Sequence, residues 1–274
     1  MKYFYVISNL SKDYVLDVQD EVQSCLEKRG AVCRYMTDYE RMKNGRHTPG
    51  EYVPEDTQCI ITIGGDGTLI QAARDLAGRN IPMLGINRGH LGFLNQVDRT
   101  EDIDAAMDAL VNERFRLEHR MMLRGTVFHE GKSVFQDIAL NEIIATSAEH
   151  LRVLRYDLAV NDEYLNEYAA DGVMVATPTG STAYNLSAGG PVMAPAGRMM
   201  AVTPVCSHTL NARSIVISEE DRVKIGLLGK GLVTFDGDTS QKTGPGDYLI
   251  VERSHMETVM VKLKQISFMQ NLSN

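Results

Sequence analysis

The sequence predicts an α/β N-terminal domain built on a doubly wound parallel sheet, followed by a β-rich, sandwich-like C-terminal domain. The first third of the chain alternates strand and helix signals in a β-α-β-α-β order, which is typical of a parallel sheet covered by helices. From about Arg120, short strand-like segments separated by turn residues replace that alternation and favour an antiparallel sheet or sandwich. A chain of 274 residues has room for both domains, and the change of pattern places their boundary near residues 97–120.

The elements of the first part follow from apolar spacing and from glycine and proline. Val15–Lys28 carries apolar residues three and four positions apart, which predicts an amphipathic helix, and Gly30 follows where that helix would stop. Cys59–Ile63 is an unbroken apolar run, as expected for a strand buried on both faces. Arg41–Pro54 is rich in glycine and proline and predicts a loop. Further strands are expected at Tyr3–Ile7, Val32–Met36 and Pro82–Ile86, and further helices at Leu69–Leu76 and Ile103–Leu110.

The second part contains short β-prone segments separated by turn sequences such as His129–Gly131 and Gly244–Gly246. Strands are expected at Thr126–Phe128, Ser133–Phe135, Asp157–Val160, Val173–Ala176, Ser214–Ser218, Val223–Leu227 and Val259–Leu263.

Composition narrows the classes of function. The formal net charge of −8 and the pI of 5.4 argue against a general nucleic-acid binder, which needs a basic surface. No apolar run approaches the roughly 20 residues that cross a bilayer, so we expect no membrane partner. The four cysteines form no CxxC pair, which predicts neither a zinc cage nor a redox dithiol and favours a reduced, cytoplasmic protein.

A glycine-rich turn between the strand Cys59–Ile63 and the next helix is the first feature that predicts chemistry. Its sequence is Gly64-Gly65-Asp66-Gly67-Thr68. Glycines let a phosphate approach the main chain, and the first N–H groups of the helix favour negative charge. A carboxylate beside phosphate is repulsive unless Asp66 holds Mg²⁺ or accepts a proton from an attacking hydroxyl. The turn lacks the Gly-Lys-Ser/Thr end of a P-loop and the G-x-G-x-x-G fingerprint of dinucleotide-binding dehydrogenases.

Three further segments accompany this turn. Ile86–Leu94 reads Ile-Asn-Arg-Gly-His-Leu-Gly-Phe-Leu and follows a predicted strand, where a tight loop would lie at the ligand-binding edge of an open sheet. Within it, Phe93 could stack on a flat base, and His90 is the one histidine that we single out for testing. Asn141-Glu142 follows an apolar stretch and pairs an amide with a carboxylate. Asp171–Pro191 contains a Thr-Pro-Thr-Gly-Ser-Thr-Ala-Tyr run, dense in neutral hydroxyl donors.

These motifs resemble those of the NAD kinase family. Gly-Gly-Asp-Gly-Thr is similar to a signature that NAD kinases share with diacylglycerol and sphingosine kinases and, more loosely, with 6-phosphofructokinases, whereas the other three segments resemble NAD kinases. The resemblance spans about residues 59–216 and is weaker at Phe235–Gly237. It implies phosphorylation of the 2′-hydroxyl of the adenosine ribose of NAD, with ATP or polyphosphate as donor and a divalent metal, Mg²⁺, held mainly by the donor phosphates.

The resemblance also implies an architecture and an assembly. We expect an α/β domain over residues 1–97, with the tail 255–274 packing back on it, and a β-rich nucleotide-binding domain over 98–254. Family members form homodimers or homotetramers with a nucleotide site near the subunit boundary, so this chain is expected to do the same.

Residue roles carry over by position. Asp66 would be the catalytic carboxylate, and Gly64, Gly65, Gly67 and Thr68 would cradle phosphates. The dinucleotide would be held by Phe93, Asn141, Glu142, Thr182, Ala183, Tyr184 and Ser187, and Asp171 would contact the nicotinamide end. Further nucleotide-binding candidates are Thr179, Asn185, Leu186 and Cys206. Ala169 is another candidate and stands where many bacterial members have Arg or Lys. Arg152 is included as the nearest upstream basic residue.

Two other functions remain open from the sequence. A diacylglycerol-type lipid kinase would share the Gly64–Thr68 turn, but it would expose an apolar entry patch and lack the Thr177–Pro191 run. A non-catalytic nucleotide-binding regulatory module would bind the same ligands without turnover. Loss of Asp66 would favour that module, and Asp66 is present.

Overall fold

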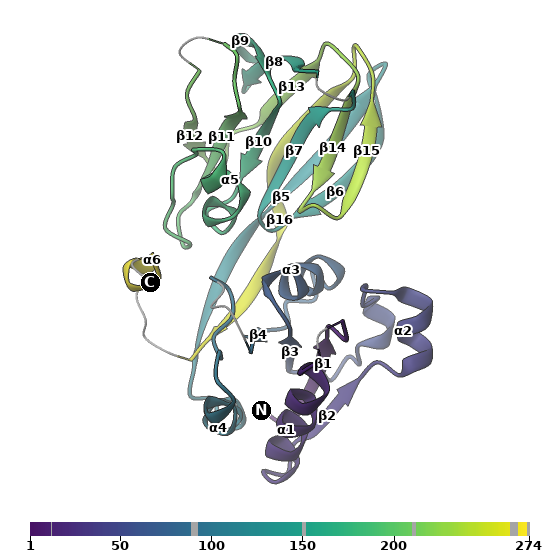
Figure 1. Ribbon diagram of the computed structural model, residues 1–274, viewed down its shortest axis with the longest axis vertical. Coiled ribbons are helices and arrows are strands. Elements are labelled where there is room, and N and C mark those ends of the chain that lie inside the picture. The colour runs from purple at the N-terminus through teal and green to yellow at the C-terminus, as the bar shows by residue number, and fades with distance from the viewer. Residues whose placement is uncertain (12, 89–92, 150–151, 210–211, 264–267, 273–274) are drawn as a thin grey trace. The chain divides into compact units, whose positions relative to one another are not determined.

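The computed structural model describes residues 1–11, 13–88, 93–149, 152–209, 212–263 and 268–272 (Figure 1). The chain forms two compact units, and the boundary falls within two long strands. The first unit comprises Met1–His119 and Glu257–Asn274, and the second comprises Arg120–Met256. Sequence patterns placed the division near residues 97–120, and the observed first unit runs on to His119 and so includes the helix that follows Asp102.

A parallel sheet forms the centre of the first unit. Its strands lie in the order β2-β1-β3-β4, and each neighbouring pair is parallel. The end of β16 adds a parallel pairing of Met260 with Met83. The unit contains β1 (Tyr3–Ser8), α1 (Val15–Glu27), β2 (Val32–Tyr35), α2 (Asp38–Asn44), η1 (Gly50–Tyr52), β3 (Cys59–Ile63), α3 (Asp66–Asp75), β4 (Met83–Ile86), η2 (Thr100–Asp102), α4 (Ile103–Val111) and α6 (Phe268–Leu272).

Helices cover both faces of this sheet, as expected for a doubly wound fold. Strand side chains alternate between the faces, and Leu84 and Ile86 share one apolar cluster with α1 and α4. Gly85, between them, faces the other side, where the side chain of Leu69 from α3 approaches it. The sheet therefore carries α1 and α4 on one face and α3 on the other.

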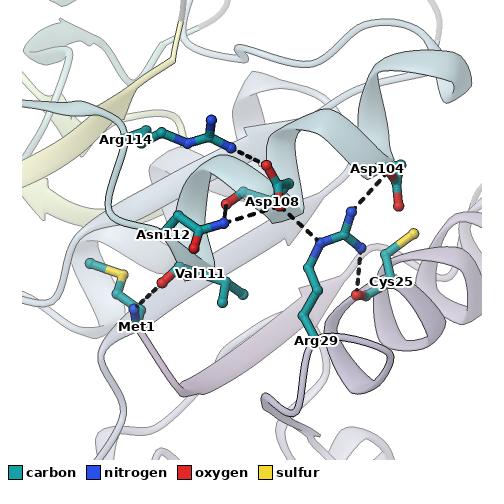
Figure 2. Close-up of polar contacts among 8 residues, drawn as sticks. All are labelled: Met1, Cys25, Arg29, Asp104, Asp108, Val111, Asn112 and Arg114. Carbon is teal, nitrogen blue, oxygen red and sulfur yellow. Dashed lines mark hydrogen bonds and ion pairs between the residues drawn. The ribbon is translucent and has the colours of Figure 1, made fainter.

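Polar contacts fasten α4 to the rest of the first unit (Figure 2). The guanidinium of Arg29 donates to Asp104 Oδ2 at 2.9 Å and to the carbonyl of Cys25 at 2.8 Å, and it contacts Asp108. The N-terminal ammonium of Met1 donates to the carbonyl of Val111 at 2.7 Å. The apolar face of α4 lies in the same cluster as α1, which explains why this helix belongs to the first unit.

Antiparallel strands build the second unit. One sheet has six strands in the order β12-β11-β10-β7-β14-β15. In a second sheet β16, β13, β8 and β9 neighbour one another, β5 pairs with β16, and β6 pairs with β5. The elements are β5 (Arg116–His129), β6 (Lys132–Ala139), β7 (Glu142–Ser147), β8 (Leu154–Val160), β9 (Glu163–Ala170), β10 (Gly172–Ala176), η3 (Gly180–Thr182), α5 (Tyr184–Ser187), β11 (Met199–Val205), β12 (Ile215–Ser218), β13 (Val223–Leu227), β14 (Gly231–Phe235), β15 (Thr239–Thr243) and β16 (Tyr248–Lys262).

A single apolar core joins the two sheets of the second unit. It includes Val173 and Val175 of β10 from the six-stranded sheet, and Ile225 of β13 and Val251 of β16 from the other. Residues two apart on a strand point to the same face, so the two inner faces meet as in a sandwich. The predicted fold class is thus confirmed: a mixed α/β unit and an antiparallel β unit.

Two expectations about local structure require correction. The segment Arg41–Pro54, predicted as a loop, contains the end of α2 and the 3₁₀ turn η1, because its glycines and prolines flank short helical turns. The segment Thr126–Phe128, predicted as a short strand, belongs to the 14-residue β5. Among the described residues, no helix has both the length and the apolarity needed to cross a bilayer.

Candidate functional site

The turn Gly64–Thr68 connects β3 to α3 in the first unit. Gly64 has φ of +152°, and a Cβ built on it would lie 2.4 Å from Thr68 Oγ1, so a larger residue cannot take its place without displacing that side chain. The N–H of Gly64 donates to the carbonyl of Ile86 at 2.9 Å, which ties the turn to β4. Chain neighbours and the backbone of α3 apart, no atom of the described residues lies within 4 Å of a Cβ built on Gly65 or Gly67, so these residues leave the turn open to a ligand.

Asp66 is the first residue of α3, and two groups hold its carboxylate. The N–H of Phe93 donates to Oδ2 at 3.0 Å, and the side-chain amide of Asn95 donates to Oδ1 at 2.5 Å. Burial raises the pKa of Asp66, while the hydrogen bonds from Phe93, Leu94 and Asn95 counteract that rise. The carboxylate is thus fixed in orientation, and each oxygen keeps acceptor capacity for a substrate.

Asn95 is a residue of this site that the sequence analysis missed. It stands one position beyond the Ile86–Leu94 segment, is only 5% exposed, and its Oδ1 has no partner among the described residues. A Cβ on Gly85 would lie 2.3 Å from that oxygen, so the missing side chain of Gly85 makes room for the amide. A buried polar residue directly after an apolar run is a sequence signal, but its target, Asp66, becomes visible only in the fold.

A cavity of about 740 Å³ opens beside the turn within the first unit. The carboxyl end of β1, the turn that follows β3 and the start of α3 border it, which is where open parallel sheets bind ligands. His47 at its wall is oriented by Asp75, whose Oδ1 lies 3.1 Å from His47 Nδ1 and also accepts from Gln71 at 2.8 Å. The polar lining includes Ser8, Asn9, Ser11, Arg46, Thr48 and Thr68.

Asn141 and Glu142 form the corner at which the chain enters β7 in the second unit. They are 8% and 9% exposed, and Asn141 Oδ1 and Glu142 Oε2 have no hydrogen-bond partner among the described residues. Burial, and secondarily the charge of Asp236, raises the pKa of Glu142 to about 8. Buried polar atoms without a partner are rare in native proteins, so these two oxygens are candidates for contact with a ligand.

The segment after β10 contains both buried residues, which bond within the protein, and residues exposed to solvent. Ser181 is buried, where its hydroxyl donates to the carbonyl of Pro178 at 2.7 Å and accepts from the N–H of Met193 at 2.9 Å. Thr179 is also buried and accepts from Arg120 at 3.2 Å. Tyr184, Leu186 and Ser187 of α5 are exposed, and Thr182 and Ala183 are half-buried. The residues facing solvent are therefore those free to contact a ligand.

Asn185, predicted to bind the nucleotide, holds the turn together with its side chain. It is fully buried, and its amide donates to the carbonyls of Ser181 and Pro191 at 3.3 and 3.0 Å. Its Oδ1 accepts from Thr203 at 2.8 Å. Because its donors and its acceptor are engaged within the protein, the structure assigns this side chain a supporting position behind the exposed residues of α5.

The remaining predicted residues lie in the second unit near the ends of β9 and β11, or in a loop. Asp171 and Cys206 are exposed, and His208 Nε2 lies 4.0 Å from Asp171 Oδ1. Ala169 donates its N–H to Thr209 Oγ1 at 3.0 Å. Arg152 is exposed in the loop before β8.

The predicted site residues thus fall into two groups. The first unit gathers Gly64, Gly65, Asp66, Gly67, Thr68 and Phe93, and the second unit contains all the others. The loop Gly89–Gly92, including His90, lies outside the described residues. No group of three or more His, Cys, Asp or Glu side chains in the described part of the chain could hold a metal ion.

Comparisons with protein families agree with this division. The model of the ATP-NAD kinase N-terminal domain matches residues 5–115, and that of the ATP-NAD kinase C-terminal domain matches residues 140–263. The NAD kinase of Lachnospira eligens is 36% identical over 292 residues, which cover 100% of this chain and 99% of the relative. The NAD kinase of Agathobacter rectalis is 37% identical, over 99% of this chain and 97% of the relative.

Solved structures share the fold. The crystal structure of yeast NADH kinase complexed with NADH has a TM-score of 0.87 at 21% identity and covers 100% of this chain and 87% of its own. The structure of an NAD kinase from Archaeoglobus fulgidus in complex with ATP has a TM-score of 0.78 at 23% identity, over 97% of this chain and 95% of its own.

Proposed function

Since the chain belongs to the ATP-NAD kinase family and phosphorylates NAD to NADP, we propose that Asp66 is its catalytic carboxylate and faces the 2′-hydroxyl of the adenosine ribose. The observation that carries this proposal is the double anchoring of Asp66 by Phe93 and Asn95 at the start of α3. Even with a pKa raised by burial, Asp66 is a weak base toward an alcohol, but phosphoryl transfer needs little activation of the nucleophile. Asp66 therefore acts mainly by orienting the hydroxyl.

The backbone of Gly64, Gly65 and Gly67, together with Thr68, would hold phosphate groups. The open backbone of the turn and its place at the N-terminus of the ten-residue helix α3, which no side chain caps, support this role. ATP is the donor that the family description names, and polyphosphate is a second donor to be tested.

The dinucleotide would be held by a set of residues, most of them polar or aromatic. Asn141 and Glu142 would use their buried, unpartnered oxygens, and the exposed face of α5 would add further contacts. The members of this set are Phe93, Asn141, Glu142, Thr179, Thr182, Ala183, Tyr184, Leu186 and Ser187, with Asp171 at the nicotinamide end and Ala169, Arg152 and Cys206 as additional contacts.

Mg²⁺ is the divalent metal we propose. Mg²⁺ usually keeps several waters and binds through one or two carboxylates plus substrate phosphates. Among the described residues, Asp66 is a single carboxylate beside an open turn, and no cluster of three ligands accompanies it. These residues therefore fit binding of Mg²⁺ through one carboxylate and substrate phosphates better than coordination by protein ligands alone. The metal would neutralise charge on the donor phosphates, and the chain would supply orientation through Asp66.

Assembly is a further part of the proposal. We propose a homodimer or homotetramer with a nucleotide site near the subunit boundary, as the family resemblance implies. Light scattering of the purified protein with and without NAD measures the mass of the assembly.

The test is NADP⁺ formation from NAD⁺, ATP and Mg²⁺, detected by an NADP-specific dehydrogenase. Asp66→Asn should lower kcat at least about 100-fold, the size expected for a positioned catalytic group. Asp104→Asn is the matched control, because Asp104 is an exposed acid of the same unit that pairs with Arg29. No NADP⁺ from wild type with ATP or polyphosphate would contradict the function, and a fully active Asp66→Asn would contradict only the role of Asp66.

A further inference from the structure

The corner Leu140–Glu142 lies between two strand ends. In the six-stranded sheet β7 is flanked by β10 and β14, and Glu142 pairs with Ala176 while Ile143 pairs with Phe235. The residues that follow these two partners are Thr177 and Asp236. Each of them therefore reaches the corner from a neighbouring strand.

Asp236 binds the N–H side of the corner. Its carboxylate accepts three consecutive backbone N–H groups, from Leu140 at 2.6 Å, Asn141 at 2.8 Å and Glu142 at 3.0 Å. Its own N–H donates to the carbonyl of Glu142 at 3.1 Å. Asp236 has φ of +49°, a left-handed conformation that aspartate and asparagine tolerate better than other residues with a side chain.

Thr177 binds the carbonyl side. Its hydroxyl donates to the carbonyl of Leu140 at 2.6 Å and accepts from the N–H of Gly180 at 3.0 Å, and its N–H donates to the carbonyl of Asn141 at 2.8 Å. A Cβ on Gly180 would lie 2.2 Å from the same carbonyl oxygen of Asn141. The backbones at Gly180 and Asn141 are therefore too close for any residue larger than glycine at position 180 without a shift.

The main chain of the corner is thus fixed on both sides, while the side-chain oxygens Asn141 Oδ1 and Glu142 Oε2 stay without a partner among the described residues. We propose that Asp236 and Thr177 are positioning residues for nucleotide binding: by holding the backbone of Leu140–Glu142, they aim these two oxygens at donor groups of the dinucleotide. The inference rests on the proposed binding roles of Asn141 and Glu142.

The first variant is Asp236→Asn, which keeps the size and the left-handed backbone but turns one acceptor oxygen into a donor facing N–H groups. Asp162→Asn is its matched control, because Asp162 is also an aspartate at positive φ but lies in an exposed turn and pairs with Arg222. Thr177→Val is the second variant, which removes the hydroxyl from the other side of the corner and is used if Asp236→Asn does not fold.

Steady-state kinetics of the full-length enzyme should show a rise of at least about 10-fold in KM for NAD⁺, since misplacement of contact atoms by less than an ångström weakens binding. KM for ATP should stay within twofold, and the melting temperature should support a folded protein. In Asn141→Ala and Glu142→Gln backgrounds, adding Asp236→Asn should raise KM for NAD⁺ by less than in wild type, because the groups it aims are already altered.

Four results would overturn the inference. An unchanged KM for NAD⁺ in Asp236→Asn, or an effect fully additive with both binding-residue variants, would show that Asp236 does not act through the corner. An equal rise of KM for both substrates would show a general structural defect. An unchanged KM for NAD⁺ in Asn141→Ala and in Glu142→Gln would refute the binding roles of these two residues. The kinase function would still be supported in that case if the wild-type protein forms NADP⁺.

Discussion

At the scale of single residues, folding moves the carboxyl group of Glu142 out of water and near the charge of Asp236. Both effects disfavour ionisation and raise the pKa of Glu142 from 4.5 to about 8. Between these two pH values the folded chain keeps a proton that the unfolded chain releases. The contribution of Glu142 to the free energy of unfolding therefore falls as pH rises from about 4.5 to about 8. Above that range the destabilisation by its buried carboxylate is fully present.

Glu142→Gln keeps the shape of the side chain and removes this ionisation, so it should stabilise the fold at pH 8.5 and change little near pH 4.5. The pKa difference sets an upper limit of about 5 kcal/mol on the gain. Urea unfolding of variant and wild type at both pH values measures it. The exposed Glu163→Gln serves as control, and a difference from wild type that is the same at both pH values would contradict the buried, unpaired state of Glu142.

At the scale of elements, β4 and α3 pack so closely that the site can form only because Gly85 of β4 has no side chain. Gly85 lies where a Cβ would meet Asn95 Oδ1 at 2.3 Å and Leu69 Cδ1 at 2.9 Å. The glycine thus lets α3 pack on the sheet and lets Asn95 reach Asp66. The same strand contributes to the packing and to the chemistry.

Gly85→Ala should lower kcat at least about 10-fold by displacing Asn95 from Asp66, and should destabilise the protein by about 1–3 kcal/mol through overpacking. Gly226→Ala is the control, because the nearest atom to a Cβ at this strand glycine is Asp157 Cβ at an ordinary 3.5 Å. Turnover and urea unfolding provide the two readouts. Wild-type kcat together with wild-type stability would contradict the close approach.

At the scale of the whole molecule, ion pairs tie together distant parts of the second unit. Glu219, which follows β12 and is 5% exposed, pairs with Arg198 before β11 and with Arg253 of β16 at 3.0 Å. One carboxylate therefore links the six-stranded sheet to a strand of the other sheet. Because both arginines are partly exposed, water can compensate them in part if Glu219 is lost.

Glu219→Gln should therefore cost about 1–3 kcal/mol of stability, below the cost of breaking a fully buried ion pair. Its exposed neighbour provides the control variant Glu220→Gln, which should change stability by less than about 0.5 kcal/mol. Chemical unfolding at low and high salt measures both. Equal stability of the two variants would indicate that the link between the sheets contributes nothing.

Local sequence was sufficient for the features that depend on neighbours in the chain. The apolar spacing of Val15–Glu27 and the run Cys59–Ile63 specified their helix and strand, and Val223–Leu227 has the predicted bounds. The motif from Gly64 to Thr68 also pointed to the head of a helix, although α3 begins three residues earlier than Leu69, where the prediction placed it. Strands such as β7 and β14 were missed, since their pairing partners are far away in the sequence.

The sequence by itself determined the class of the two domains, the family and the motif residues, because periodicity, glycine placement and motif strings are encoded over a few positions. Only the tertiary structure decided which polar groups serve those motifs. Asn95 holds Asp66 from 29 residues away, and Asp236 holds Asn141 from 95 residues away. The tertiary structure also decided that the side chain of Asn185 bonds to Ser181 and Thr203 within the protein. The physical reason is that hydrogen bonds and burial depend on distance in space, which the order of residues along the chain does not state.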